Sequence, residues 1–272
     1  MKNILLITAF VSFTLNFFAQ EAADKKVQAG LTIGYGMNFQ KMGTKLLEAD
    51  GIGSDLTIGA NVNWSLTETI GFFTGLEFDF ESLKYKTPAS DSVFYYYKEA
   101  DNTLVEFGDP YTDPTLHEND NIYQLSKRKQ KPVYLTIPTM LSFRTKFIGY
   151  FRYFGKFGLR TSILLSNKIT DEGVNYPVSG ASNTNDNKDM TAKNEMFPIK
   201  SAVGLAGGAE WNFVGATSLV AEIGYYYGFT PLYNDRKTEK TYLQSTGSYD
   251  NPPVFSNKAT QSQLMFKVSI LF

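Results

Sequence analysis

The sequence contains no cysteine and only one histidine, His117, among its 272 residues. The lack of cysteine excludes a disulfide framework, a thiolate metal site, a cysteine nucleophile and a lipid-modified cysteine anchor. Net charge is also small, because 26 basic residues oppose 27 acidic ones and leave −1. A chain without an overall positive field lacks the electrostatic attraction that nucleic acids require, so we expect no nucleic-acid partner.

Long apolar runs are scarce, and the longest lies at the extreme N-terminus. Lys2 precedes an apolar run over residues 4–18, which the small Ala19 and the polar Gln20 close. The run is short for a membrane helix, which needs ~20 residues, and its position is typical of a secretory signal peptide. We predict a cleaved signal peptide over residues 1–20 and one mature domain over residues 21–272.

Aromatic residues and glycine are abundant, and their spacing predicts β-strands. Aromatics make up 15% of the chain, and there are 22 glycines. From Val27 onward, apolar residues alternate with small or polar ones, as in Leu31, Ile33 and Tyr35. Similar alternation recurs over residues 56–64, 72–80, 133–143, 153–165, 199–211, 219–229 and 264–272. Each stretch suits the ~9–11 residues of a tilted transmembrane strand.

The connections between these eight stretches alternate in length. Short links cover residues 65–69, 145–151 and 214–216, and long ones cover residues 40–53, 84–131, 168–197 and 230–258. Outer-membrane barrels alternate short periplasmic turns with long external loops in this way. We therefore predict an all-β fold: an eight-stranded antiparallel up-and-down transmembrane β-barrel. We expect this barrel to lie in a bacterial outer membrane, surrounded by lipid, with both termini in the periplasm.

Charged residues on the face opposite the apolar one distinguish this fold from a soluble β-sandwich or lipocalin-like barrel. A soluble fold would bury the apolar face and expose the charges, whereas a membrane barrel turns the apolar face to lipid and the charges to its lumen. The predicted lumen residues are Glu77, Asp79, Glu81, Arg144, Lys156, Arg160, Lys200, Glu210, Glu222 and Lys267. Five acids and five bases predict a salt-bridged plug, because eight strands leave little open lumen; a proton or ion path is the alternative.

The long segment after the third strand contains the remaining candidate residues. His117 fits a solvated loop histidine better than a catalytic base, because no serine flanks it. The acids between Asp91 and Asp120 lack the regular spacing of a calcium loop, so we expect no metal and no cofactor. Residues 93–97 and 103–107 predict a hairpin. We expect partner contacts here, at Tyr95, Tyr96, Tyr97, Asp109, Tyr111 and Asp113.

Three strand sequences resemble a known family. These are the Tyr134-Leu135-Thr136-Ile137-Pro138 strand, the glycine-rich residues 204–211 and the tyrosine-rich residues 222–229. They resemble the PorT-like outer-membrane barrels of Bacteroidetes, a namesake of which is implicated in secretion of cell-surface proteins. We expect Pro138 to sit at a β-bulge, since proline removes a ladder donor.

We predict a non-enzymatic outer-membrane protein, because no group of residues is specific enough to identify a substrate. The resemblance implies a role as a scaffold or accessory in protein secretion or envelope assembly, in contact with proteins of those systems. A narrow transport or ligand-binding barrel is the alternative, followed by an outer-membrane hydrolase.

Overall fold

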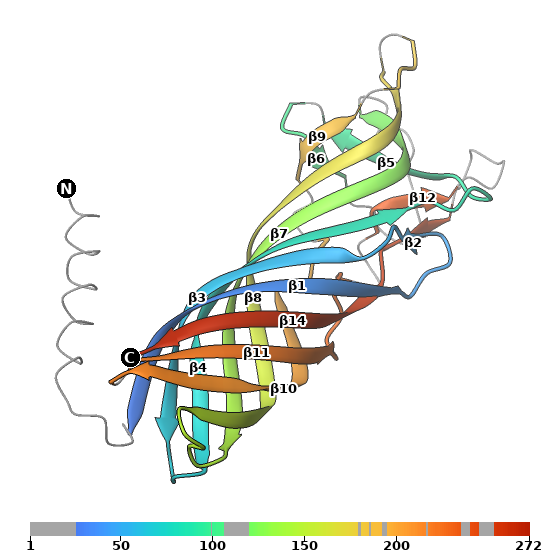
Figure 1. Ribbon diagram of the computed structural model, residues 1–272. Helices are drawn as coiled ribbons and strands as arrows, with labels where there is room; N and C mark the ends of the chain where they lie inside the picture. The colour runs from blue at the N-terminus through green and yellow to red at the C-terminus, as the bar shows by residue number, and fades with distance from the viewer. Residues whose placement is uncertain are drawn as a thin grey trace, which may run out of the picture.

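Eight long antiparallel strands form a closed ring (Figure 1). The computed structural model describes residues 26–98, 100–105, 120–178, 181–184, 186–191, 195–215, 217–234, 240–244 and 253–272. Around the ring the strands are β1 (Val27–Met42), β3 (Gly53–Ser65), β4 (Ile70–Lys86), β7 (Asn121–Arg144), β8 (Phe151–Tyr176), β10 (Ile199–Val214), β11 (Thr217–Gly228) and β14 (Ala259–Leu271). Because β14 pairs with β1 and β7 pairs with β8, no strand of the ring has a free edge. The predicted eight-stranded antiparallel barrel is confirmed.

Alternation along each strand gives the ring an apolar outside. On β1, Leu31 is 62% exposed and Ile33 is 55% exposed, whereas Thr32 between them is 4% exposed. The register places Ile33 beside Ile58 of β3 and Val268 of β14, so outward apolar side chains lie next to one another across strands. These side chains form the band that a membrane barrel presents to lipid.

Short turns join the strands at one end of the barrel, as the sequence predicts. The connections cover residues 66–69, 145–150 and 215–216. Gly149 and Gly215 have φ angles of 65° and 53°, which glycine adopts without strain. The C-terminus lies at this end in Figure 1.

At the opposite end, several predicted loop regions are strands. The predicted loop 84–131 begins inside β4 and ends inside β7, and the predicted loop 168–197 begins inside β8. The extended ends of β4, β7 and β8 join short strands in a structure that we call the external cap (Figure 1). The short strands are β2 (Glu48–Ala49), β5 (Val93–Lys98), β6 (Thr103–Leu104), β9 (Asn187–Met190), β12 (Tyr242–Gln244) and β13 (Val254–Phe255). The predicted hairpin is confirmed, since β5 pairs with β6.

The external cap has a largely apolar interior, whereas the barrel has a polar one. Strand β4 shows the change: its inward residues are Glu77, Asp79 and Glu81 in the barrel, then Leu83 and Tyr85 in the cap. The main apolar core of the described residues gathers in the cap around Tyr85, with members from β5, β7 and β12. A strand that passes from lipid into water needs this change, because its outward residues must become polar and its inward residues apolar.

Pro138 causes no bulge, so that prediction is wrong. The register between β4 and β7 has the same offset before and after it, pairing Thr74 with Thr139 and Glu77 with Thr136. The two pairs between these, at Gly75 and Leu76 of β4, are missing from the ladder. Proline lacks the N–H group, so a hydrogen bond is lost, but no extra residue is inserted. A register shift occurs instead between Val133 and Tyr134, on the β8 side of β7.

The predicted signal peptide, residues 1–20, lies outside the described residues. Within the described part of the chain, no helix is long and apolar enough to span a bilayer.

Candidate functional site

The centre of the lumen is a buried cluster of opposite charges. Glu77 on β4 accepts hydrogen bonds from Lys267 on β14, at 2.6 Å, and from Arg160 on β8, at 2.9 Å. Arg160 also lies 2.9 Å from Asp79, which accepts a further hydrogen bond from Thr57 at 2.7 Å. Every one of these side chains is nearly inaccessible to solvent. Charges buried this deeply require such complete pairing, because an unpaired one would lose its hydration without compensation.

Further ion pairs fill the lumen on both sides of this cluster. Towards the cap, Lys200 on β10 donates to Glu81. Towards the short turns, Lys156 lies 2.5 Å from Glu222 on β11. Lys156 also lies 3.5 Å from the ring centroid of Phe73, a close cation–π contact. Side chains from strands that are distant in sequence therefore meet across the barrel axis.

The structure places the ten predicted lumen residues inside the barrel and adds two that were not predicted from the sequence. Arg144 donates to Ser65 Oγ at 2.7 Å. Glu210 pairs at 2.6 Å with Arg152, which was not predicted. Asp55 is the second addition and accepts a hydrogen bond from Gln263. Arg152 could have been found from the alternation of β8, because it stands between the outward Phe151 and Tyr153.

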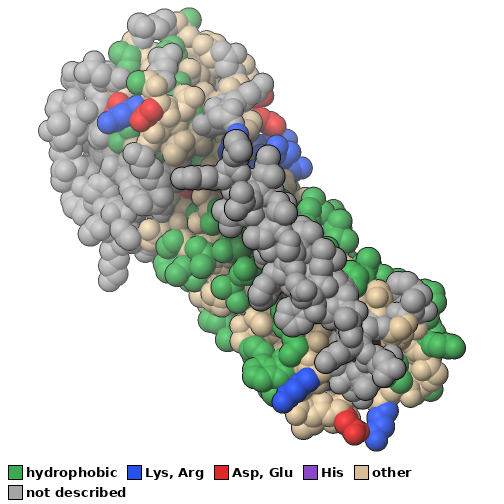
Figure 2. Space-filling model, turned by 90° about the vertical axis from the view of Figure 1, so that its left-hand side faces the viewer, with side chains coloured by type: hydrophobic (Ala, Val, Ile, Leu, Met, Phe, Trp, Pro, Cys, Tyr) green, Lys and Arg blue, Asp and Glu red, His purple; other side chains and the backbone are tan. Residues whose placement is uncertain are grey.

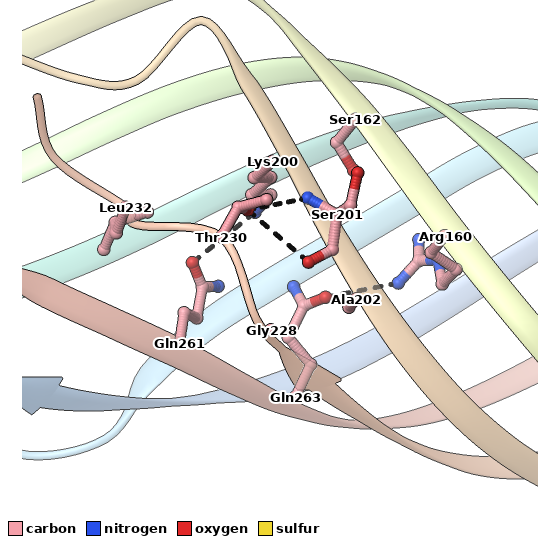
Figure 3. Close-up of a pocket in the computed structure, with 10 residues that line it drawn as sticks. All are labelled: Arg160, Ser162, Lys200, Ser201, Ala202, Gly228, Thr230, Leu232, Gln261 and Gln263. Atoms are coloured by element: carbon pink, nitrogen blue, oxygen red, sulfur yellow. Dashed lines mark hydrogen bonds between the residues drawn. The ribbon is translucent and has the colours of Figure 1, made fainter.

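The space left between these side chains is small. One lumen cavity has a volume of about 20 Å³. Among the residues that line it, Arg160 donates to Gln263 and Lys200 donates to Gln261 (Figure 3). A second cavity of about 20 Å³ lies nearer the short turns and is lined by Asn61, Arg144 and Lys156, among others. Each has room for about one water molecule.

In the external cap, a second buried cluster surrounds Arg128 of β7. Its Nε and Nη2 atoms donate to the two carboxylate oxygens of Asp171 on β8, both at 2.6 Å. Its Nη1 atom donates to Glu195 at 3.1 Å. Tyr85 donates to the same Glu195 oxygen at 2.8 Å, and Tyr95 donates to Asp171 at 2.6 Å. One guanidinium thus links β4, β5, β7, β8 and the segment before β10.

The electrostatics of this cluster keep Arg128 charged and the phenols neutral. Burial lowers the pKa of Arg128, but Asp171, Tyr242, Tyr85 and Glu195 together outweigh this effect, so the pKa rises well above its usual value. Burial raises the pKa of Tyr85 well above 10, against the opposing effect of Arg128. Burial and then Asp171 raise the pKa of Tyr95 in the same way. The phenols therefore act as hydrogen-bond donors to the carboxylates at neutral pH.

The Arg128 cluster was not predicted, because residues 127–131 resemble part of a loop in sequence. The alternation of inward Tyr123, Leu125, Arg128 and Gln130 was the available signal, although a register shift between Leu125 and Lys127 interrupts it.

The predicted partner-contact residues do not form one exposed surface. The side chains of Tyr95 and Tyr97 are buried in the core of the cap, at 0% and 4% exposure, so the prediction that they contact a partner is wrong. Alternation on β5 turns them inward and leaves Tyr96 half-buried on the other face. Asp109, Tyr111 and Asp113 lie outside the described residues, as does His117. Over the residues that are described, no group of three His, Asp or Glu side chains is arranged to hold a metal ion.

Comparisons with known proteins agree with the fold. A family model described as "Outer membrane protein beta-barrel domain" matches residues 18–234. No curated protein matches the chain.

Several solved outer-membrane proteins are similar in structure. The outer membrane protein OprG from Pseudomonas aeruginosa is 11% identical with a TM-score of 0.43, over 93% of this chain and 97% of that one. Ail, the attachment invasion locus protein of Yersinia pestis, is 12% identical with a TM-score of 0.32, over 91% of this chain and 100% of that one. The outer membrane protease OmpT from Escherichia coli is 10% identical with a TM-score of 0.32, over 94% of this chain and 99% of that one. Similarities at this level assign no activity.

Proposed function

The chain belongs to the outer membrane protein beta-barrel domain family, and on this premise we propose that it is a non-enzymatic scaffold or accessory in protein secretion or envelope assembly. It is a small β-barrel protein of the outer membrane. In the proposed role the barrel anchors the protein in lipid, and the external cap and its loops present a surface to proteins of the secretion or assembly machinery.

The observation that carries the proposal is the filled lumen. Arg160 of β8 pairs with both Glu77 and Asp79 of β4, and the adjoining cavities have room for about one water molecule each. A transport barrel needs a continuous hydrated path, which barrels of about eight strands seldom leave. The same pairing supports the non-enzymatic role, because the buried carboxylates are held by cations and are inaccessible to a substrate.

Two further parts of the proposal come from the sequence. Residues 1–20 act as a cleaved signal peptide, and residues 21–272 form the mature domain. The protein is a PorT-like barrel of Bacteroidetes, a proposal that the strand residues 134–138 support.

Affinity purification of the tagged, full-length protein from gently solubilised outer membranes tests the role. We expect mass spectrometry to recover secretion or envelope-assembly proteins reproducibly. The variant Asp109→Asn/Tyr111→Ala/Asp113→Asn should lose them, because these side chains and Tyr96 are the remaining predicted partner contacts.

An Asp50→Asn/Asp91→Asn variant, which changes acids elsewhere in the external connections, is the control and should retain the same partners. Recovery of the barrel alone from wild-type membranes would contradict the scaffold role and favour a transport barrel.

A further inference from the structure

Six lysines lie on the outward faces of three adjacent strands, just beyond the end of the barrel that carries the external cap. We call this group the lysine patch; it consists of Lys84 and Lys86 on β4, Lys127, Lys129 and Lys131 on β7, and Lys168 on β8. All are solvent-exposed except Lys86, which is half-buried. Arg128 and Gln130 alternate with the β7 lysines and point into the cap, so the strand itself separates the basic side chains onto one surface.

The strand register sets these lysines directly opposite one another. Lys84 pairs with Lys129, Lys86 with Lys127, and Lys131 with Lys168. Side chains at directly opposed positions have Cβ atoms only about 4.5–5.5 Å apart, and like charges there destabilise a sheet. Three such pairs in succession therefore require a source of negative charge nearby.

The protein supplies only part of that charge. Glu48 lies 3.2 Å from Lys86, and Glu172 lies 4.0 Å from Lys127. In the part of the chain that the structure describes, no carboxylate forms an ion pair with Lys84, Lys129 or Lys131. These three lysines lie on the side of the patch nearer the barrel.

The patch begins where the lipid-facing band ends. On β4 the outward series runs Phe78, Phe80, Ser82, Lys84. On β7, Lys131 is one outward position beyond Val133, and on β8 Lys168 follows the exposed Leu165. Figure 2 shows hydrophobic side chains along the barrel, with Lys and Arg side chains beyond them towards the cap. The patch is thus placed at the level of the headgroups of the outer leaflet.

We propose that the lysine patch binds the phosphate groups of a phosphorylated lipid in the outer leaflet, with Lys84, Lys129 and Lys131 as the principal contacts. The leaflet supplies the negative charge that Lys84, Lys129 and Lys131 require, and its phosphate groups lie at the same level as these three side chains. Because the patch covers only β4, β7 and β8, the lipid binds one side of the barrel.

Binding of purified lipid A to the full-length protein in a neutral detergent tests this proposal. The Lys84→Gln/Lys129→Gln/Lys131→Gln variant should bind on the order of 100-fold more weakly, since each lysine near an anionic lipid surface contributes about fivefold. Replacing the same three residues with arginine should retain binding. Lipid A from which the phosphates have been removed should bind the wild type as weakly as phosphorylated lipid A binds the glutamine variant.

The matched control is Lys26→Gln/Lys41→Gln/Lys45→Gln, which removes the same charge from exposed positions elsewhere and should bind like the wild type. Heat-dependent migration in gels verifies that every variant is folded. The proposal is overturned if the first glutamine variant, once folded, binds lipid A as tightly as the wild type. Equal binding of the dephosphorylated lipid, or equally tight binding of inorganic pyrophosphate, would also overturn it.

Discussion

Arg128 and its sequence neighbours show how one basic run serves two purposes. Lys127 and Lys129 point to solvent, whereas Arg128 is fully buried between Asp171 and Glu195. Arginine suits the buried position because its planar group donates to both oxygens of one carboxylate and still reaches a second. The guanidinium therefore determines how β8 and the segment before β10 pack against β7.

Replacing Arg128 with leucine should loosen the external cap while leaving the barrel folded. The change leaves Asp171 and Glu195 buried without their cation, which costs about 3–5 kcal/mol. We expect amide protons of β5 and of residues 121–128 to exchange faster with solvent, as measured by mass spectrometry.

Lys127→Leu provides the comparison, because an exposed side chain with a distant partner affects stability by less than about 0.5 kcal/mol. Equal protection of the cap in the wild type and the Arg128→Leu protein would contradict the assigned role of Arg128.

Single-residue roles could be predicted in the lumen and not in the cap. In the lumen, strict alternation identifies Glu77 or Lys267 as inward once the strand is recognised. In the cap, the inward side chains are tyrosines and leucines, which are also common in loops that cover a barrel. The carboxylates that pair with Arg128 lie 43 and 67 residues further along the chain, a separation that local pattern does not reveal.

At the scale of elements, two of the three glycines in β8, Gly158 and Gly155, differ in the space around them. A Cβ atom added at Gly158 would lie 2.3 Å from the backbone oxygen of Thr139 and 2.6 Å from Cα of Met140. A Cβ atom at Gly155 would find its nearest neighbour at 3.9 Å. Gly158 allows β7 and β8 to approach closely, whereas Gly155 has no neighbour that requires a glycine.

Gly158→Ala should therefore lower the free energy of unfolding by about 1–3 kcal/mol, since backbone atoms must move to admit the methyl group. Gly155→Ala should change it by no more than about 0.5 kcal/mol. Urea unfolding of the two variants in the same detergent, followed by tryptophan fluorescence, measures both. If both midpoints shifted equally, the close approach at Gly158 would not be the cause.

Strand number was predictable because eight stretches share one alternation, but the lengths of β7 and β8 were not. These strands run for 24 and 26 residues, well beyond the membrane. In their outer parts the outward residues are largely polar. The pattern of outward apolar residues that identifies a transmembrane strand therefore ends at Val133 and Leu165. The opposed lysines beyond those points resemble a solvated loop in sequence.

For the whole molecule, two interiors of opposite character lie along one axis. Ion pairs fill the barrel, where lipid surrounds it, and tyrosines and leucines fill the external cap, where water surrounds it. The barrel could be predicted because membrane insertion imposes a repeating pattern. The cap could not, because its core combines segments from the four long connections, which have no common period.

Electrical recording from the wild-type protein in planar lipid bilayers tests the filled lumen most directly. We expect insertion to leave the membrane conductance at its baseline, because Arg160, Glu77 and Asp79 close the barrel at its centre. Discrete, repeated openings of the wild-type protein would contradict this expectation and would make the barrel a channel.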